Sequence, residues 1–173
     1  MPKPGYAWWH LVLHTKGSWL HGDPRGFRTR QHRIHSSGDY KSPPPSGEHQ
    51  NLHQYEKEKL KNAVVIPTHL YQIIGQALYL KSSKMNVKTL AISVGPTHAH
   101  LQVELENNYK VALKHTAKIK QAASYAVRNA LPGSLWARGG KPIAISDLKH
   151  QIRVYQYIQT HAKQGDWVWT FQD

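Results

Sequence analysis

The sequence predicts an α+β fold of the ferredoxin-like, split βαβ type: an antiparallel sheet with helices on one face, plus a C-terminal helix. Apolar residues alternate with period two in several short segments and recur with helical spacing in three longer ones. These segments follow one another in the order β, long loop, α, β, β, α, β, α. We expect the 173 residues to form a single domain with a hydrophobic core.

The N-terminal part begins with a strand and then loses its pattern. Residues 6–15 are expected to form the first strand. The chain from Lys16 to about Asn62 is rich in Gly, Pro, His, Arg and Ser, so we expect a long functional loop or insertion at about 17–62. Four arginines of this segment are candidates for DNA-phosphate contacts, with solvation of a loop as the alternative: Arg25, Arg28, Arg30 and Arg33.

The middle of the chain predicts a helix and two strands. Thr68 is expected to cap a helix that runs to about Ser83, with apolar residues spaced along one face. Strands are expected at 87–94 and from His98 to Leu105, separated by the tight break Gly95-Pro96.

The C-terminal part predicts two helices and two short strands. A helix over about 111–131 carries a basic stripe, either a solvated face or a DNA contact, that includes Lys114 and Lys118. A strand at 135–138 ends at Arg138, another DNA-binding candidate. A last helix over about 147–163 has Ser146 or Asp147 as its N-cap, and an aromatic strand at 167–171 follows.

Composition indicates the class of partner. The formal charge is +13, from 23 Lys and Arg against 10 Asp and Glu, which favours a polyanion such as nucleic acid. The scarcity of carboxylates argues against a two-metal nuclease, which needs a carboxylate cluster, whereas the chain has 13 histidines. Without cysteine, thiolate chemistry is excluded. With no apolar run long enough to span a membrane and no leader-like N-terminus, we expect a cytoplasmic protein that does not engage a membrane.

The triplet His98-Ala99-His100 is a candidate metal-binding motif. Residues i and i+2 of a strand share a face, so His98 and His100 point the same way, roughly 7 Å apart along the strand. Gln102 and Glu104 share that face, where they could contact the metal ligands from outside or simply be exposed, and exposure is the favoured interpretation. The alternative is a pair of surface histidines, because a bare H-x-H motif is weak.

The last helix carries a tyrosine and another histidine one turn apart. Its expected core stripe follows the helical period and contains Leu148, Ile152, Tyr155, Ile158 or Gln159, and Ala162. Tyr157 lies about 200° around the helix from Tyr155 and is an i, i+4 neighbour of His161. His161 could complete a three-histidine metal face while Tyr157 acts as a nucleophile on a metal-bound phosphate. Otherwise the two are simply exposed side chains.

Several motifs together resemble the single-tyrosine HUH transposases, which include the DNA-nicking enzymes of small insertion sequences and their REP-associated relatives. The matching stretches are HLVLHTK at 10–16, GSWLHGD at 17–23, GPTHAHLQV at 95–103, LWARG at 135–139 and YIQTH at 157–161. The resemblance spans most of the chain except about 24–60. Ala99 is smaller than the family's usual residue, and His161 stands where Gln or Asn is commoner.

The resemblance implies a chemistry and a set of partners. In the family the tyrosine attacks a phosphodiester of single-stranded, hairpin-bearing DNA and leaves a 5′-phosphotyrosine link, with Mg²⁺ or Mn²⁺ as cofactor. This would make Tyr157 the nucleophile and His98, His100 and His161 the metal ligands of a DNA transposase. Many members are homodimers in which the tyrosine helix can serve the partner's histidines.

Two other functions remain open from the sequence. A domesticated, non-catalytic nucleic-acid-binding module of the same fold would bind strongly and without regard to metal. A zinc hydrolase would use the same histidines and release its products without a covalent adduct.

Overall fold

A five-stranded antiparallel sheet forms the centre of the computed structural model, which describes residues 2–24, 26–27, 35–37, 44–59, 63–140 and 142–171. The strand order is β4-β1-β3-β2-β5. The strands are β1 (Tyr6–His14), β2 (Thr89–Val94), β3 (His98–Glu106), β4 (Ile143–Ala144) and β5 (Trp167–Thr170). The α+β class and the antiparallel sheet predicted from the sequence are therefore confirmed.

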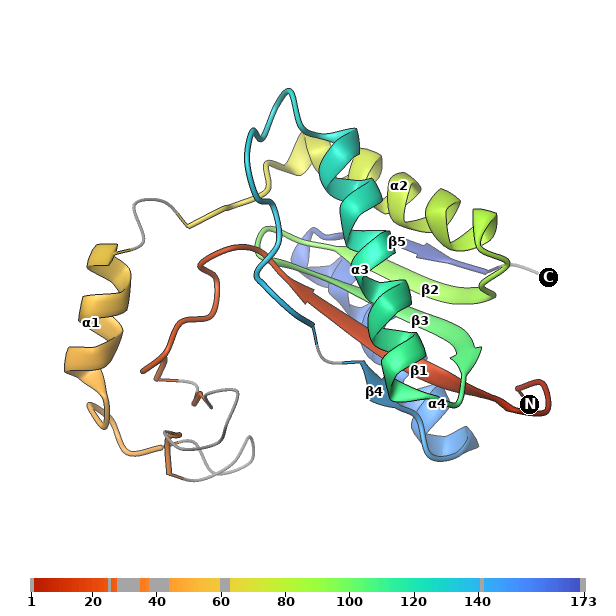
Figure 1. Cartoon of the computed structure of the whole chain (residues 1–173), viewed down its shortest axis with the longest axis horizontal. Helices are drawn as coiled ribbons and strands as arrows, with labels where there is room; N and C mark the ends of the chain where they lie inside the picture. Colours follow the sequence, from red (N-terminus) through yellow and green to blue (C-terminus); the bar gives the residue numbers. More distant parts are fainter. Residues whose placement is uncertain are drawn as a thin grey trace.

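Helices cover both faces of this sheet (Figure 1). Helices α2 (Tyr71–Lys84) and α3 (Tyr109–Ala126) lie together on one face, and α4 (Leu148–Thr160) lies on the other. A short 3₁₀ turn, Thr68–Leu70, precedes α2, and another, His161–Gln164, follows α4. No helix in the described part of the chain is long and apolar enough to cross a membrane.

Strand parity divides the side chains between these two faces. On β3, Ala99, Leu101 and Val103 are fully buried in the main apolar core under α2 and α3. The alternate residues of β3 face α4, where a smaller cluster includes Trp8, Val154 and Ile158. The histidines of β3 therefore lie beneath α4 rather than on an open surface.

Strand β5 is fixed to the sheet edge by a close contact with α2. Trp167 pairs with Val94 of β2 and packs its indole ring on Gly75. A Cβ atom added at Gly75 would overlap the Trp167 ring, so only glycine admits the ring at this point. The contact fixes where the turn before β5 meets the end of α4.

The segment over 17–62, expected to be a long loop or insertion, includes a helix, α1 (Gln50–Lys59), which lies apart from the sheet (Figure 1). Several other expected boundaries were wrong. Thr68 begins the 3₁₀ turn and makes no side-chain capping bond to it. Helix α3 starts earlier than expected because Asn108 caps it, accepting from the backbone N–H groups of Lys110 and Val111. The expected strand at 135–138 is one bridge between Thr15 and Trp136, and the two-residue β4 lies beyond it.

The expected core stripe of α4 was wrong in part. Ile158 is buried as expected and Tyr155 packs partly buried against the same cluster, but Leu148 and Ile152 are 65% and 47% exposed. Val154, outside the expected stripe, is buried instead. The reason is the surface that α4 covers, because Val154 and Ile158 pack in one cluster with Trp8 and Ala91 of the sheet. Asp147 does cap the helix as expected, since its carboxylate accepts from the His150 backbone N–H at 2.8 Å.

Candidate metal and tyrosine site

Three histidines from two distant parts of the chain meet between β3 and the end of α4. His98 and His100 come from β3, and His161 is the first residue after α4. One ring nitrogen from each lies within 4.8 Å of the others, a separation at which the three could hold one metal ion. The His100 and His161 ring centroids are 4.8 Å apart, and those of His98 and His161 are 5.1 Å apart.

Two of these ring nitrogens lie in surroundings that suit a metal ligand. The Nε2 atoms of His100 and His161 are buried and have no hydrogen-bond partner among the described residues. A buried polar atom without a partner is costly to the fold. Coordination of a metal ion would satisfy both atoms, and neutral imidazole nitrogens are ligands that transition metals favour.

His10 of β1 belongs to this cluster, although the sequence argument did not include it. Its Nε2 lies 2.9 Å from His100 Nδ1, in hydrogen-bond contact. Burial lowers the pKa of His10 to about 4, and the nearby His150 and His161 add to the effect. Burial lowers the pKa of His100 to about 2, aided by His10 and His98. Both rings are therefore neutral at pH 7, the form in which imidazole binds metal.

Asp166 is a second residue that the sequence argument missed. Its Oδ2 lies 2.8 Å from His161 Nδ1, and both side chains are 4% exposed. Parity along β1 could have identified His10, which falls on the same face as His98 and His100. No comparable pattern points to Asp166, because its position depends on the turn between α4 and β5.

Tyr157 lies beside the histidines of its own chain. Its ring centroid is 5.2 Å from that of His100 and 5.0 Å from that of His161. The side chain is 47% exposed, so a large substrate could reach it. Partial burial raises the pKa of Tyr157 above 10, and the Asp166 carboxylate adds to the rise. The phenol is thus protonated at neutral pH.

The polar residues that follow the histidines on β3 are buried, contrary to expectation. Gln102 is fully buried and donates from Nε2 to the backbone carbonyl of Gln151 on α4 at 3.1 Å. Glu104 is 5% exposed, and its Oε1 accepts from the Lys3 backbone N–H at 2.7 Å. The expectation failed because it left α4 off this face. Both residues link the histidine strand to neighbouring segments of the chain.

The candidate DNA-binding residues fall into three groups. Arg25, Arg28, Arg30 and Arg33 lie outside the described residues. Lys114 and Lys118 are exposed on α3, which covers the sheet face opposite α4 and the histidines. The structure therefore does not bring these lysines to the histidine cluster.

Arg138 is exposed beside the strand edge that leads to the cluster. A hollow of about 250 Å³ is bordered by Arg138, Lys120 and His14, among others. His14 pairs directly with His98 in the sheet, and its carbonyl accepts from the Ala137 backbone N–H at 2.9 Å. Lys120 holds this loop by donating from Nζ to the carbonyl oxygens of Ala137 and Gly139.

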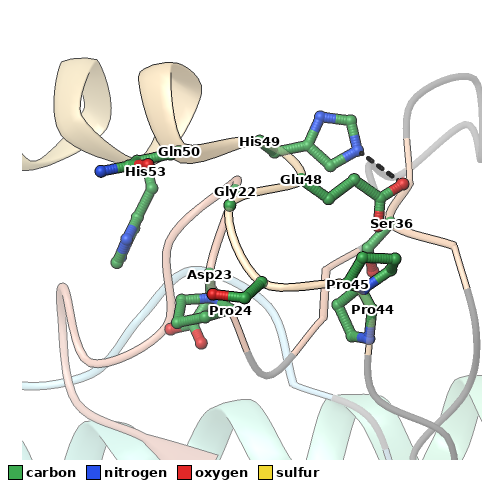
Figure 2. A pocket seen from close by; sticks show the side chains of 12 residues that line it. Gly22, Asp23, Pro24, Ser36, Pro44, Pro45, Glu48, His49, Gln50 and His53 are labelled. Atoms are coloured by element: carbon green, nitrogen blue, oxygen red, sulfur yellow. Dashed lines mark ion pairs between the residues drawn. The ribbon is translucent and has the colours of Figure 1, made fainter.

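A separate pocket lies at the start of α1 (Figure 2). Figure 2 shows the ion pair between two of its lining residues, His49 and Glu48. His49 Nε2 lies 3.5 Å from Glu48 Oε1. The cavity measures about 260 Å³, and neither Tyr157 nor the three clustered histidines line it. It is thus distinct from the candidate site.

Comparison with solved structures identifies the architecture around this site. A REP-associated tyrosine transposase bound to a REP hairpin superposes with a TM-score of 0.50 at 16% identity, over 92% of this chain and 68% of that one. The chain has the fold of a REP-associated tyrosine transposase. The resemblance drawn from the sequence motifs is thereby confirmed at the level of the fold.

Other comparisons add little. A putative transposase from Deinococcus radiodurans R1 matches with a TM-score of 0.44 at 14% identity, over 90% of each chain. No protein-family model matches the sequence, and no curated protein matches it either. The REP-associated transposase fold is consequently a finding of structure rather than of sequence identity.

Proposed function

We propose that this protein is a metal-dependent transposase that nicks and rejoins single-stranded, hairpin-bearing DNA through a tyrosine nucleophile. One observation carries the proposal: Tyr157 packs against a three-histidine cluster whose Nε2 atoms at His100 and His161 are buried without partners. A pure DNA-binding module has no need of this arrangement. The fold shared with a transposase bound to a REP hairpin supports the same class of substrate.

The proposed cleavage needs Tyr157 and one phosphodiester. A Mg²⁺ or Mn²⁺ ion held by His98, His100 and His161 would offset charge on the phosphate oxygens, and imidazole ligands favour Mn²⁺. Tyr157 Oη bonds to phosphorus as the bond from phosphorus to O3′ breaks. The phenol loses its proton, the departing O3′ gains one, and the protein stays on the 5′-phosphate.

The basic surface would guide the strand to this site. The net charge of +13 favours association with a polyanion. Arg138 and the hollow beside His14 lie next to the histidine strand, so we propose that the strand passes there. Lys114 and Lys118 would contact DNA only where it wraps around to α3.

We further propose that the protein forms a homodimer. Leu148 and Ile152 present an exposed apolar surface on α4 that a second copy could cover. Tyr157 contacts its own chain's histidines, which supports cleavage within one chain rather than across the dimer. Mixing Tyr157→Phe protein with protein that carries both His98→Ala and His100→Ala tests whether cleavage occurs within one chain. The mixture should not cleave DNA. Restored cleavage would indicate that the tyrosine of one chain serves the histidines of the other.

An adduct gel tests the proposed function. The protein is incubated with a library of 3′-labelled single-stranded hairpins, with Mn²⁺ or with EDTA, and resolved under denaturing conditions. We expect labelled DNA to migrate with the protein only when Mn²⁺ is present. Strong binding without an adduct would favour the non-catalytic module, and cleavage without an adduct would favour a zinc hydrolase.

A further inference from the structure

Asp166 is a buried carboxylate in direct contact with one candidate metal ligand. Its side chain is 4% exposed, and its Oδ2 lies 2.8 Å from His161 Nδ1. Burying an ionised carboxylate is costly unless a partner compensates it. A partner that donates a hydrogen bond, as His161 can from Nδ1–H, meets that cost.

The chain makes room for this carboxylate in two ways. Trp167, the first residue of β5, faces α2 and packs on Gly75, and Asp166, which immediately precedes the strand, is directed to the other side, against His161. Gly95, in the turn between β2 and β3, lies directly against the Asp166 carboxylate. A Cβ atom there would stand 2.5 Å from Oδ1, so a larger residue at Gly95 would displace it.

The contact fixes which nitrogen of His161 is free. When Nδ1 carries the proton and donates to Asp166, Nε2 keeps its lone pair. That Nε2 is the buried atom without a partner, and it belongs to the ring that meets His98 and His100. A carboxylate bound to the far nitrogen of a ligating histidine fixes its tautomer and ring orientation and increases its basicity.

We propose that Asp166 is a positioning residue for the metal site: it holds the His161 Nδ1–H, and thereby aims Nε2 at the ion shared with His98 and His100. The inference rests on the proposed function, because it requires that the three histidines bind metal. It also gives a reason why a histidine can serve where related proteins more often have an amide. The amide needs no partner to set its tautomer, whereas the histidine does.

Calorimetric titration of the full chain with MnCl₂ tests this role separately from catalysis. Asp166→Asn keeps the size of the side chain but can present either an oxygen or an NH₂ group to His161. We expect it to weaken Mn²⁺ binding roughly 10-fold, and Asp166→Ala up to about 100-fold. Asp147→Asn, at an exposed carboxylate of the α4 N-cap, is the control and should leave the Mn²⁺ Kd unchanged.

A second genetic background, the His161→Gln variant, distinguishes a positioning role of Asp166 from a purely structural one. In His161→Gln protein the ring is gone, so adding Asp166→Asn should change the Mn²⁺ Kd by less than about threefold. Equal weakening in both backgrounds, or an unchanged Kd for Asp166→Asn in the wild type, would overturn the inference while leaving the metal site intact. Failure of the wild type to bind Mn²⁺ would overturn the metal site as well. Thermal unfolding of each variant shows which are folded, and Asp166→Asn carries the test if Asp166→Ala is not.

Discussion

His100 and His161 place their ring centroids 4.8 Å apart, although one lies in the middle of the sheet and the other just past the last helix. Neither neighbours the other in the chain, so the packing of α4 on β3 creates the pair. The same packing brings Tyr157 to 5.2 Å from His100. The proposed function depends on this one contact between a strand and a helix end.

Removal of the histidine pair should abolish metal binding. Replacing His98 and His100 together by alanine removes two of three candidate ligands, so we expect the Mn²⁺ affinity to fall by at least ~100-fold, since loss of an outer partner alone costs ~10–100-fold. Metal-dependent cleavage should disappear with it. His115→Gln, on α3 and outside the cluster, is the control. Undiminished cleavage by the double variant would contradict the assignment of His98 and His100 as metal ligands.

Stability of the metal-free protein should fall with acid. Burial lowers the pKa of His100 to about 2 and that of His10 to about 4, whereas both titrate near 6.5 when unfolded. Below pH 6.5 the unfolded chain therefore binds more protons than the folded one, so the free energy of unfolding decreases as pH drops toward about 4. Above about pH 7 both histidines are neutral in the folded and the unfolded chain, so they no longer make the free energy of unfolding depend on pH.

Thermal unfolding at pH 7.5 and pH 5 measures this effect. For His100, an interval of about 1.5 pH units below its unfolded pKa corresponds to about 2 kcal/mol, or roughly 4–8 °C in Tm. His100→Gln cannot take up a proton, so its Tm should depend less on pH. An identical acid-induced decrease in the variant would show that other groups are responsible.

Arg138 should contribute to DNA binding through charge. Each phosphate contact on a single strand adds about 0.7 to the slope of log K against log salt concentration. Arg138→Ala should reduce that slope by about this amount in anisotropy titrations with a single-stranded hairpin. A double variant of Lys114 and Lys118, on the opposite face, should lose less affinity. Equal slopes for Arg138→Ala and wild type would remove Arg138 from the DNA path.

The strands of this fold could be predicted where a residue alternation is long enough to read. The alternation from His98 to Leu105 identified β3 and the shared face of its histidines. Two-residue β4 carries no such pattern, and the segment at 135–138 resembles a strand yet makes a single bridge. Strand pairing at this edge depends on the segment that lies next to it in the fold rather than on the local sequence.

The orientation of α4 could be predicted from the sequence only in part. Hydrophobic spacing placed Leu148 and Ile152 inward, because an apolar stripe normally faces the core. Ile158 is buried as that spacing predicts, but the helix packs on Trp8 and Ala91 through Val154 as well, which leaves Leu148 and Ile152 exposed. A single sequence does not reveal which surface a helix will cover. Asp166 was missed because its position depends on the turn between α4 and β5.

The central claim is that Tyr157 becomes covalently joined to DNA. The most direct measurement is peptide mass spectrometry of the denatured adduct formed with Mn²⁺ and a single-stranded hairpin, after nuclease trimming. We predict a 5′-phosphonucleotide on Tyr157 and no adduct from folded Tyr157→Phe protein, with its Mn²⁺ Kd unchanged. Adduct formation by Tyr157→Phe, or the nucleotide on another residue, would contradict the account.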